Sequence, residues 1–168
     1  MFDSGTIKKL FLALNAELKK KEVKGEVGMC GGAVMCLVFK AREATKDIDA
    51  LFEPTAEIRD ACKKVAHQHG LSPDWLNDAA KSFFHTMPIQ QNIFEFSHLR
   101  VWAPTAEYML AMKCISARFD THDKDDVVFL IKWLKLKKLE QALEIVVRFY
   151  PKKLVPAKTQ FLLEELFE

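Results

Sequence analysis

Residues 26–52 read EVGMCGGAVMCLVFKAREATKDIDALF, and this stretch decides the fold that we predict. Residues 26–30 are short and largely apolar, which indicates a strand, and the pair Gly31-Gly32 ends it. Residues 33–41 then have the apolar character of a buried helix, and residues 45–52 read as a second strand. A strand, a glycine pair, a helix and another strand in this order favour an α/β fold.

Two aspartates lie two positions apart on the second of these strands. Side chains at positions i and i+2 of a strand point to the same side, so Asp47 and Asp49 are expected to project together, with Ile48 facing the core. Adjacent carboxylates repel each other, and a divalent cation removes this conflict. Mg²⁺ prefers oxygen ligands and commonly joins carboxylates to phosphates. The pair therefore predicts a metal site.

The glycine pair supplies the second half of this hypothesis. Gly31 and Gly32 allow the backbone to approach a ligand closely, and the N-terminus of the following helix favours a phosphate. Each motif alone has a plainer interpretation, since Gly-Gly is most often a turn and Asp-x-Asp is most often a solvated strand edge or turn. Their occurrence together in this order favours a phosphate and metal site, although the stretch contains neither GxGxxG nor GK[ST].

The rest of the chain reads mainly as helices around a small sheet. Strands are expected within residues 93–102, and helices are expected over residues 4–21, 55–69 (ended by Gly70), 72–84, 104–118, 123–135, 138–149 and 157–167. The predicted class is α/β (α+β), with a small mixed sheet flanked by helices and a helical C-terminal half. Residues 1–103 form the core with its N-terminal helix, and residues 104–168 pack on it as part of a single compact unit.

Composition places few limits on function. The 168 residues are 49% hydrophobic and 29% charged, with a net charge of +2, which is ordinary for a globular protein and too small to indicate a nucleic-acid partner by itself. Lysines cluster in two places, at residues 19–21 and at Lys132, Lys135, Lys137 and Lys138. These clusters are either solvated helix faces or a basic rim that attracts a polyanionic substrate.

Cysteine usage and hydropathy bear on the compartment. The four cysteines form no CxxC pair and read as buried, reduced thiols. The start of the chain lacks a basic segment followed by an apolar one, and no apolar run approaches the roughly 20 residues that span a bilayer. We therefore expect a cytoplasmic protein with no membrane partner.

At this point the residues resemble a known family. Gly31-Gly32 followed by Asp47-Ile48-Asp49 resembles the signature of the polymerase-beta-like nucleotidyltransferase superfamily. A longer pattern, over about residues 26–135, is similar to small prokaryotic nucleotidyltransferases that include the AbiEii-type abortive-infection toxins. In those proteins a helix with Lys-x4-Arg and an acidic helix start, often Asp-x-x-Asp, follow the aspartate pair. The corresponding residues here are Lys113, Arg118, Asp123 and Asp126, with Asp125 between the last two and His122 where a lysine often stands.

The resemblance implies a nucleotidyltransferase fold and a Mg²⁺-dependent (or Mn²⁺-dependent) transfer of a nucleoside monophosphate from a nucleoside triphosphate to a hydroxyl acceptor. It implies an RNA or tRNA end, or a protein, as acceptor, and a toxin role with an antitoxin partner. It implies metal binding by Asp47 and Asp49. It further implies catalytic roles for Asp47, Asp49, Lys113, Asp123 and Asp126, and nucleotide contacts for Gly31, Gly32, Thr45, Lys46, Lys113 and Arg118.

Several alternatives stay open. Lys113 is otherwise a snorkelling surface lysine, the later aspartates are otherwise helix caps, and Lys46 and Arg42 are otherwise solvated loop charges. A third metal-binding carboxylate is not clear, and Glu95 is the best placed by strand alternation. Its absence favours the alternative of a catalytically degenerate binding or antitoxin-like module, which the intact Gly-Gly and Asp-x-Asp pair opposes. A metal-dependent phosphohydrolase that uses the same aspartate pair is a third option.

Overall fold

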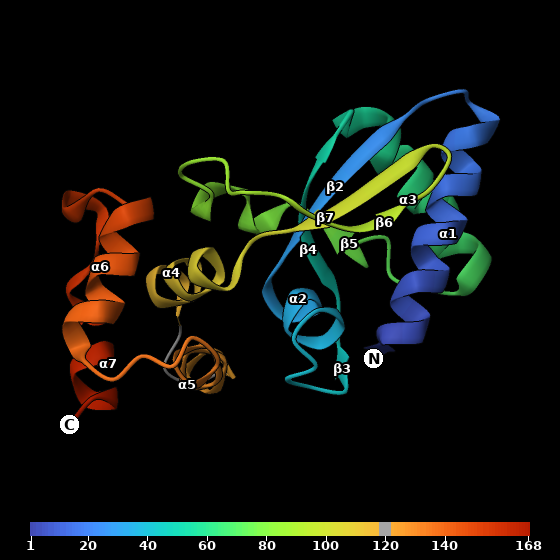
Figure 1. Ribbon diagram of the computed structural model, residues 1–168. Coiled ribbons are helices and arrows are strands. Elements are labelled where there is room, and N and C mark those ends of the chain that lie inside the picture. Colours follow the sequence, from blue (N-terminus) through green and yellow to red (C-terminus); the bar gives the residue numbers. More distant parts are fainter. Residues whose placement is uncertain (118–121) are drawn as a thin grey trace. The chain divides into compact units, whose positions relative to one another are not determined.

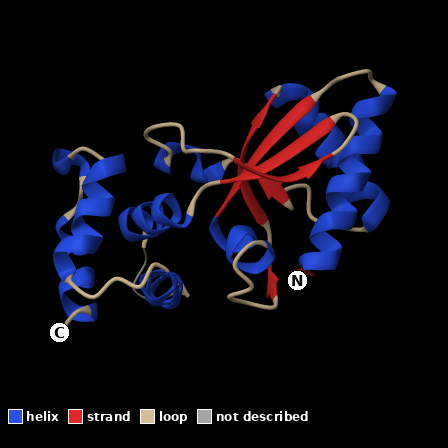
Figure 2. Ribbon diagram, viewed as in Figure 1, coloured by secondary structure: helices blue, strands red, loops and turns tan. Residues whose placement is uncertain are grey.

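The computed structural model describes residues 1–117 and 122–168, which group into two compact units. Unit 1 comprises Met1–Lys81 and Gln90–Pro104, and unit 2 comprises Ser82–Ile89 and Thr105–Glu168. The described residues form a mixed α/β fold with seven α-helices, a mixed five-stranded sheet and a small two-stranded sheet (Figures 1 and 2). The predicted boundary after residue 103 assigns residues 82–89 to the N-terminal part, whereas they group with unit 2.

The sheet of unit 1 has the strand order β5-β4-β2-β7-β6. Its strands are β2 (Gly25–Cys30), β4 (Ile48–Glu53), β5 (Leu76–Asn77), β6 (Gln91–Glu95) and β7 (Leu99–Ala103). The central strand β2 pairs antiparallel with β4 and parallel with β7. The edge strands β5 and β6 pair parallel with β4 and antiparallel with β7, respectively. Two short strands, β1 (Phe2–Asp3) and β3 (Ala44–Thr45), form the second sheet.

Helices α1 (Ser4–Lys20) and α3 (Thr55–His69) lie side by side against the sheet (Figure 1). Both are amphipathic, and their apolar faces are buried as the periodicity predicts. Their side chains meet over the start of β2, where Leu18 and Ile58 methyl carbons lie 3.0 and 3.1 Å from the position of a Cβ on Gly25. Gly70 ends α3 in the left-handed conformation, as expected of a glycine after a helix.

The predicted helix over residues 72–84 is wrong. The segment instead contains the short strand β5 and a 3₁₀ helix over Ala79–Phe83. The Trp75 side chain is buried and its indole N–H donates to the Cys62 carbonyl oxygen at 3.0 Å, while the Trp75 carbonyl accepts from Ile48 N at 2.8 Å. These long-range contacts outweigh the local helix-start signal of Ser72-Pro73-Asp74.

Unit 2 is built around α4 (Ala106–Ser116), which is buried on nearly all sides. Helices α5 (Asp123–Trp133), α6 (Leu139–Phe149) and α7 (Ala157–Leu166) pack against it, so the predicted helices of this part are confirmed with small shifts of their ends. Segment 82–89 is held by the Tyr108 hydroxyl, which donates to the Thr86 carbonyl at 2.6 Å, and by the Tyr150 hydroxyl, which donates to the Phe83 carbonyl. No helix among the described residues is both long and apolar enough to cross a bilayer.

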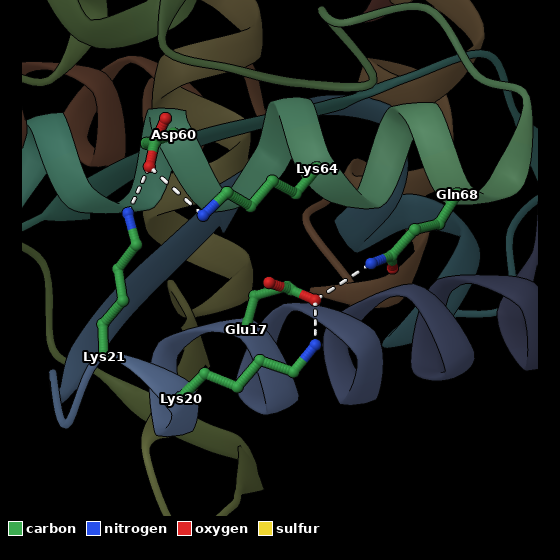
Figure 3. A network of polar contacts seen from close by, with 6 residues as sticks. All are labelled: Glu17, Lys20, Lys21, Asp60, Lys64 and Gln68. Carbon is green, nitrogen blue, oxygen red and sulfur yellow. Dashed lines mark hydrogen bonds and ion pairs between the residues drawn. The ribbon is translucent and has the colours of Figure 1, made fainter.

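A polar network joins α1 to α3 (Figure 3). Glu17, only 5% exposed, accepts hydrogen bonds from Lys20 Nζ at 2.9 Å and from Gln68 Nε2 at 3.0 Å. The hydrogen bond from Lys20, followed by that from Gln68, holds the pKa of the Glu17 carboxyl below its ordinary value. At the exposed end of the network, Asp60 pairs with Lys21 and Lys64.

Replacing Glu17 by Gln is expected to destabilise the protein at neutral pH by about 1–2 kcal/mol, because a charge-assisted hydrogen bond is lost in a largely buried place. The Glu17 pKa is lowered in the folded state, so this stabilisation is present above the pKa of the unfolded chain and is lost as pH falls through the folded value. Urea unfolding between pH 7 and pH 3 measures it. The difference in free energy of unfolding between wild type and Glu17→Gln should become smaller as the pH falls. Asp60→Asn removes an exposed ion pair and should lower the free energy of unfolding by less. A gap that stays constant with pH contradicts the assignment.

Candidate functional site

Asp49 lies beside the turn from β2 into α2 (Gly31–Leu37). It is the second residue of β4 and pairs with Cys30, the last residue of β2. The next residue, Gly31, has φ +62, and a Cβ placed on it would lie 2.8 Å from Asp49 Oδ2. Glycine is therefore favoured at this position both by the left-handed backbone and by the neighbouring carboxylate. The structure thus brings the first glycine of the pair and the second aspartate into direct proximity.

The second glycine faces a different pair of side chains. A Cβ on Gly32 would lie 2.8 Å from Thr45 Oγ1 and 3.0 Å from Arg42 Nη1. Thr45 is 6% exposed, and its hydroxyl donates to the Asp47 carbonyl at 3.1 Å. One corner of unit 1 therefore contains both glycines, a carboxylate, a hydroxyl and a guanidinium. Of these, Arg42 is the residue that sequence reasoning left most uncertain, because its loop position gives no periodicity.

The two aspartates do not share a strand. β4 begins at Ile48, and the predicted strand over residues 45–52 is interrupted by a bend that contains Lys46 and Asp47, both exposed. Strand alternation therefore fixes the direction of Asp49 but not that of Asp47, which corrects the sequence-based reasoning. The two Cα atoms are still at most about 7 Å apart, because only one residue separates them.

The donor set fits a divalent cation of the hard, oxygen-preferring type. Mg²⁺ typically takes one or two carboxylates and completes its shell with substrate phosphate and water oxygens. Asp47 and Asp49 supply two such carboxylates. Among the residues that the structure describes, no group of three or more His, Cys, Asp or Glu is placed to hold a metal ion.

Glu95 cannot be the third ligand for this cation. It is the last residue of β6 and pairs with Arg100, which in turn pairs with Glu26 on β2. Asp49 instead pairs with Cys30, four residues further along β2. At roughly 3.3 Å per residue this is about 13 Å of strand, well beyond the reach of one metal ion. The hypothesis from strand alternation is therefore wrong, because alternation says nothing about register between strands.

Asn77 is the residue that the sequence analysis missed. It pairs with Asp49 across β4 and β5, and directly paired residues project to the same face of a sheet. Its Oδ1 accepts from Ala79 N at 3.1 Å, and its Nδ2 donates to the Asp74 carbonyl at 3.3 Å. A neutral amide thus lies beside Asp49. The predicted helix over 72–84 concealed this neighbour, and no local pattern indicates it.

Lys113 lies in a buried ion-pair cluster inside unit 2. Its side chain extends from α4, is 7% exposed as a residue, and places Nζ 3.1 Å from Asp123 Oδ1 and 2.8 Å from Asp126 Oδ2. Both carboxylates come from the first turn of α5, and Asp126 is 4% exposed. An ammonium group has three N–H donors, so Lys113 keeps donor capacity for one further acceptor. Lys113 is therefore not a snorkelling surface lysine.

The predicted site includes further charged residues besides those of the Lys113 cluster, and they lie in different parts of the chain. Asp125 is exposed and lies 3.7 Å from the exposed His122 ring, measured from Oδ2 to Nδ1, so it does not join Lys113. Arg118 lies outside the described residues. Asp47 and Asp49 belong to unit 1 and Lys113 belongs to unit 2.

Comparisons with known proteins were made at three levels. A scan against protein-family models found no match, and searches of curated proteins and of solved structures found none either. The nucleotidyltransferase resemblance therefore stays a prediction.

Gly31→Ala and Gly70→Ala form a matched pair of tests for the contact at Asp49. Both glycines have nearly the same positive φ, +62 and +64, but a Cβ on Gly70 would meet nothing within 4 Å. Gly70→Ala should cost about 1–2 kcal/mol for the left-handed backbone alone. Gly31→Ala should lower the free energy of unfolding by at least about 1 kcal/mol more than Gly70→Ala, because it also displaces the Asp49 carboxylate. Chemical unfolding measures both, and equal costs would argue against a close Gly31–Asp49 approach.

Lys113→Met should destabilise the protein by about 3–5 kcal/mol, since it removes a buried ammonium that pairs with two carboxylates. Lys124→Met is the matched control, because Lys124 Nζ also pairs with a carboxylate in unit 2, that of Glu165 at 2.6 Å, but both side chains are exposed. It should cost at most about 1 kcal/mol. Thermal unfolding monitored by circular dichroism distinguishes the two. Similar losses for both variants would mean that the Lys113 cluster is not buried in solution.

Proposed function

We propose that the protein is a Mg²⁺-dependent nucleotidyltransferase that moves a nucleoside monophosphate from a nucleoside triphosphate to a hydroxyl acceptor. The observation that carries this proposal is the approach of the Asp49 carboxylate to Gly31, with a Cβ position only 2.8 Å from Oδ2. Gly31 and Asp49 are separated in sequence but adjacent at one corner of the sheet. This proximity is what a site that must hold phosphates beside carboxylates requires.

In this proposal Asp47 and Asp49 hold the cation, which when bound neutralises carboxylate and phosphate charge. The backbone of Gly31 and Gly32 lies beside the triphosphate, with Thr45 and Lys46 close by. The acceptor hydroxyl oxygen bonds to the α-phosphorus, and the bond from that phosphorus to the bridging oxygen breaks. Pyrophosphate leaves, and the hydroxyl proton passes to water. Catalysis of this kind comes mainly from positioning and charge neutralisation.

The Lys113 cluster has a supporting role in the same proposal. Within unit 2, Asp123 and Asp126 hold the Lys113 ammonium in place, and it is the resemblance that assigns these three residues to catalysis. The resemblance further assigns Arg118 to the nucleotide, and it suggests an RNA or tRNA end, or a protein, as the acceptor. It also suggests a toxin whose partner is an antitoxin.

A second candidate is a nucleotidyltransferase-fold module that binds a partner, in the manner of an antitoxin, without chemistry. The specific observation in its favour is the neutral amide of Asn77 beside Asp49, in a described site with only two carboxylates. Such a module would bind nucleotide or a protein partner but would transfer nothing.

The test measures binding and transfer separately. Titration calorimetry with each NTP should show binding that requires Mg²⁺, and Mn²⁺ paramagnetic resonance should show a bound cation without any turnover. Incubation with α-labelled NTP and a cell lysate should then place label in RNA or protein, with release of pyrophosphate. Asp49→Asn, which keeps the size of the side chain beside Gly31, should abolish both metal binding and transfer.

Glu53→Gln is the matched control, because Glu53 is an exposed carboxylate at the other end of β4. It should bind metal and transfer label as the wild type does. Nucleotide binding without transfer would favour the binding module, and release of free nucleotide without a labelled acceptor would favour a phosphohydrolase. Absence of Mg²⁺-dependent NTP binding in the wild type would reject the enzyme proposal.

A further inference from the structure

A run of lysines with one tryptophan connects the end of α5 to the start of α6. Residues 132–138 read KWLKLKK, and no acidic residue occurs between Asp126 and Glu140. All four lysines of this run, Lys132, Lys135, Lys137 and Lys138, are exposed. Across residues 1–117 and 122–168, no carboxylate lies within ion-pair distance of their ammonium groups. We call these four residues, with Phe129 and Trp133, the lysine–tryptophan surface.

Trp133 is the exposed tryptophan of the chain. It is 54% exposed, whereas Trp75 and Trp102 are 1% and 2% exposed. Its ring stacks on Phe129 one helical turn earlier, with centroids 5.8 Å apart and an interplanar angle of 26°. Trp133 thus packs part of its ring against Phe129, and its exposed part belongs to the same short segment as the four exposed lysines.

The fold itself does not favour lysine at three of these positions. Lys135 has φ +56 and follows the end of α5, a place where glycine is the usual residue because it avoids the left-handed penalty. Lys137 and Lys138 stand at the start of α6, where the helix dipole disfavours positive charge. Lysine at these three positions therefore contributes no local stability, as is common for residues that serve binding.

We propose that the lysine–tryptophan surface binds single-stranded nucleic acid, with phosphates on the lysines and a base stacked on Trp133. Lysines that neutralise phosphates release counterions, and an exposed aromatic ring stacks on a base of any sequence. A base must be unstacked from its neighbours to reach such a ring, which favours a single strand over a duplex. An anionic membrane is the weaker fit, because membrane-surface helices need a broad exposed apolar face and Val127 and Leu130 of α5 are buried.

The binding test uses no nucleotide triphosphate, so its outcome is separate from that of the transfer proposal. A fluorescein-labelled single-stranded RNA of about 12 nucleotides, and a DNA of the same sequence, are titrated with the full chain and followed by anisotropy. If all four lysines contact phosphates, log K should fall against log salt with a slope of about −3. Unlabelled RNA should quench the tryptophan emission through Trp133, because the other two tryptophans are buried.

Two variants test whether the nucleic acid binds at the lysine–tryptophan surface. Trp133→Ala should weaken binding about 5- to 150-fold, which is the stacking contribution of one base. Lys135→Gly should weaken binding and make the salt slope shallower by about 0.7, while the protein becomes more stable to urea because the left-handed strain is relieved. A loss of binding together with a gain of stability is not produced by unfolding.

The double variant Lys152→Gln/Lys153→Gln is the matched control, since both lysines are exposed in unit 2 but lie outside the surface. It should bind as the wild type does. The proposal is overturned if neither RNA nor DNA binds, or if the control loses as much affinity as Trp133→Ala. It is also overturned if Trp133 emission responds to phosphatidylserine vesicles and not to the oligonucleotides, which would make the surface a membrane contact.

Discussion

The approach of the Asp49 carboxylate to the backbone of Gly31 is the constraint on which the candidate site depends. The antiparallel pairing of β2 with β4 places Asp49 opposite Cys30, so the chain leaves β2 most easily through a residue without a side chain. Gly32 satisfies a similar requirement toward Thr45 and Arg42. The consequence is that the start of α2, the end of β3 and the start of β4 meet at one corner, whatever ligand that corner binds.

The parts of the fold that follow from local physics could be predicted from the sequence. Periodic apolar positions and a glycine stop are sufficient for α1 and α3, and the capping position of Thr105 is sufficient for the start of α4. The segment around Trp75 could not be predicted in this way. Its structure is decided by a hydrogen bond to Cys62 and by pairing with β4, and neither partner is visible from the local pattern.

The residues of the candidate site also differ in whether local sequence is sufficient to identify them. Sequence reasoning could single out Gly31 and Asp49, because their types and order are unusual, and also the acidic first turn that accepts Lys113. It could not identify Asn77 or exclude Glu95, because both depend on the register between strands that are distant in sequence. It also overextended the second strand, since a one-residue difference in where β4 begins decides whether alternation applies to Asp47.

The four cysteines are all buried thiols outside any disulfide, and burial raises the pKa of both Cys62 and Cys114 to about 12. Thiols of this kind react with alkylating reagents only when the surrounding structure opens, because the thiolate is the reactive form. Cys62 belongs to unit 1 and Cys114 to unit 2, each on a helix that packs in its own core. The rate at which each of these two thiols is alkylated therefore reports how often its own unit opens. Mass spectrometry of the alkylated peptides would measure both rates in one sample.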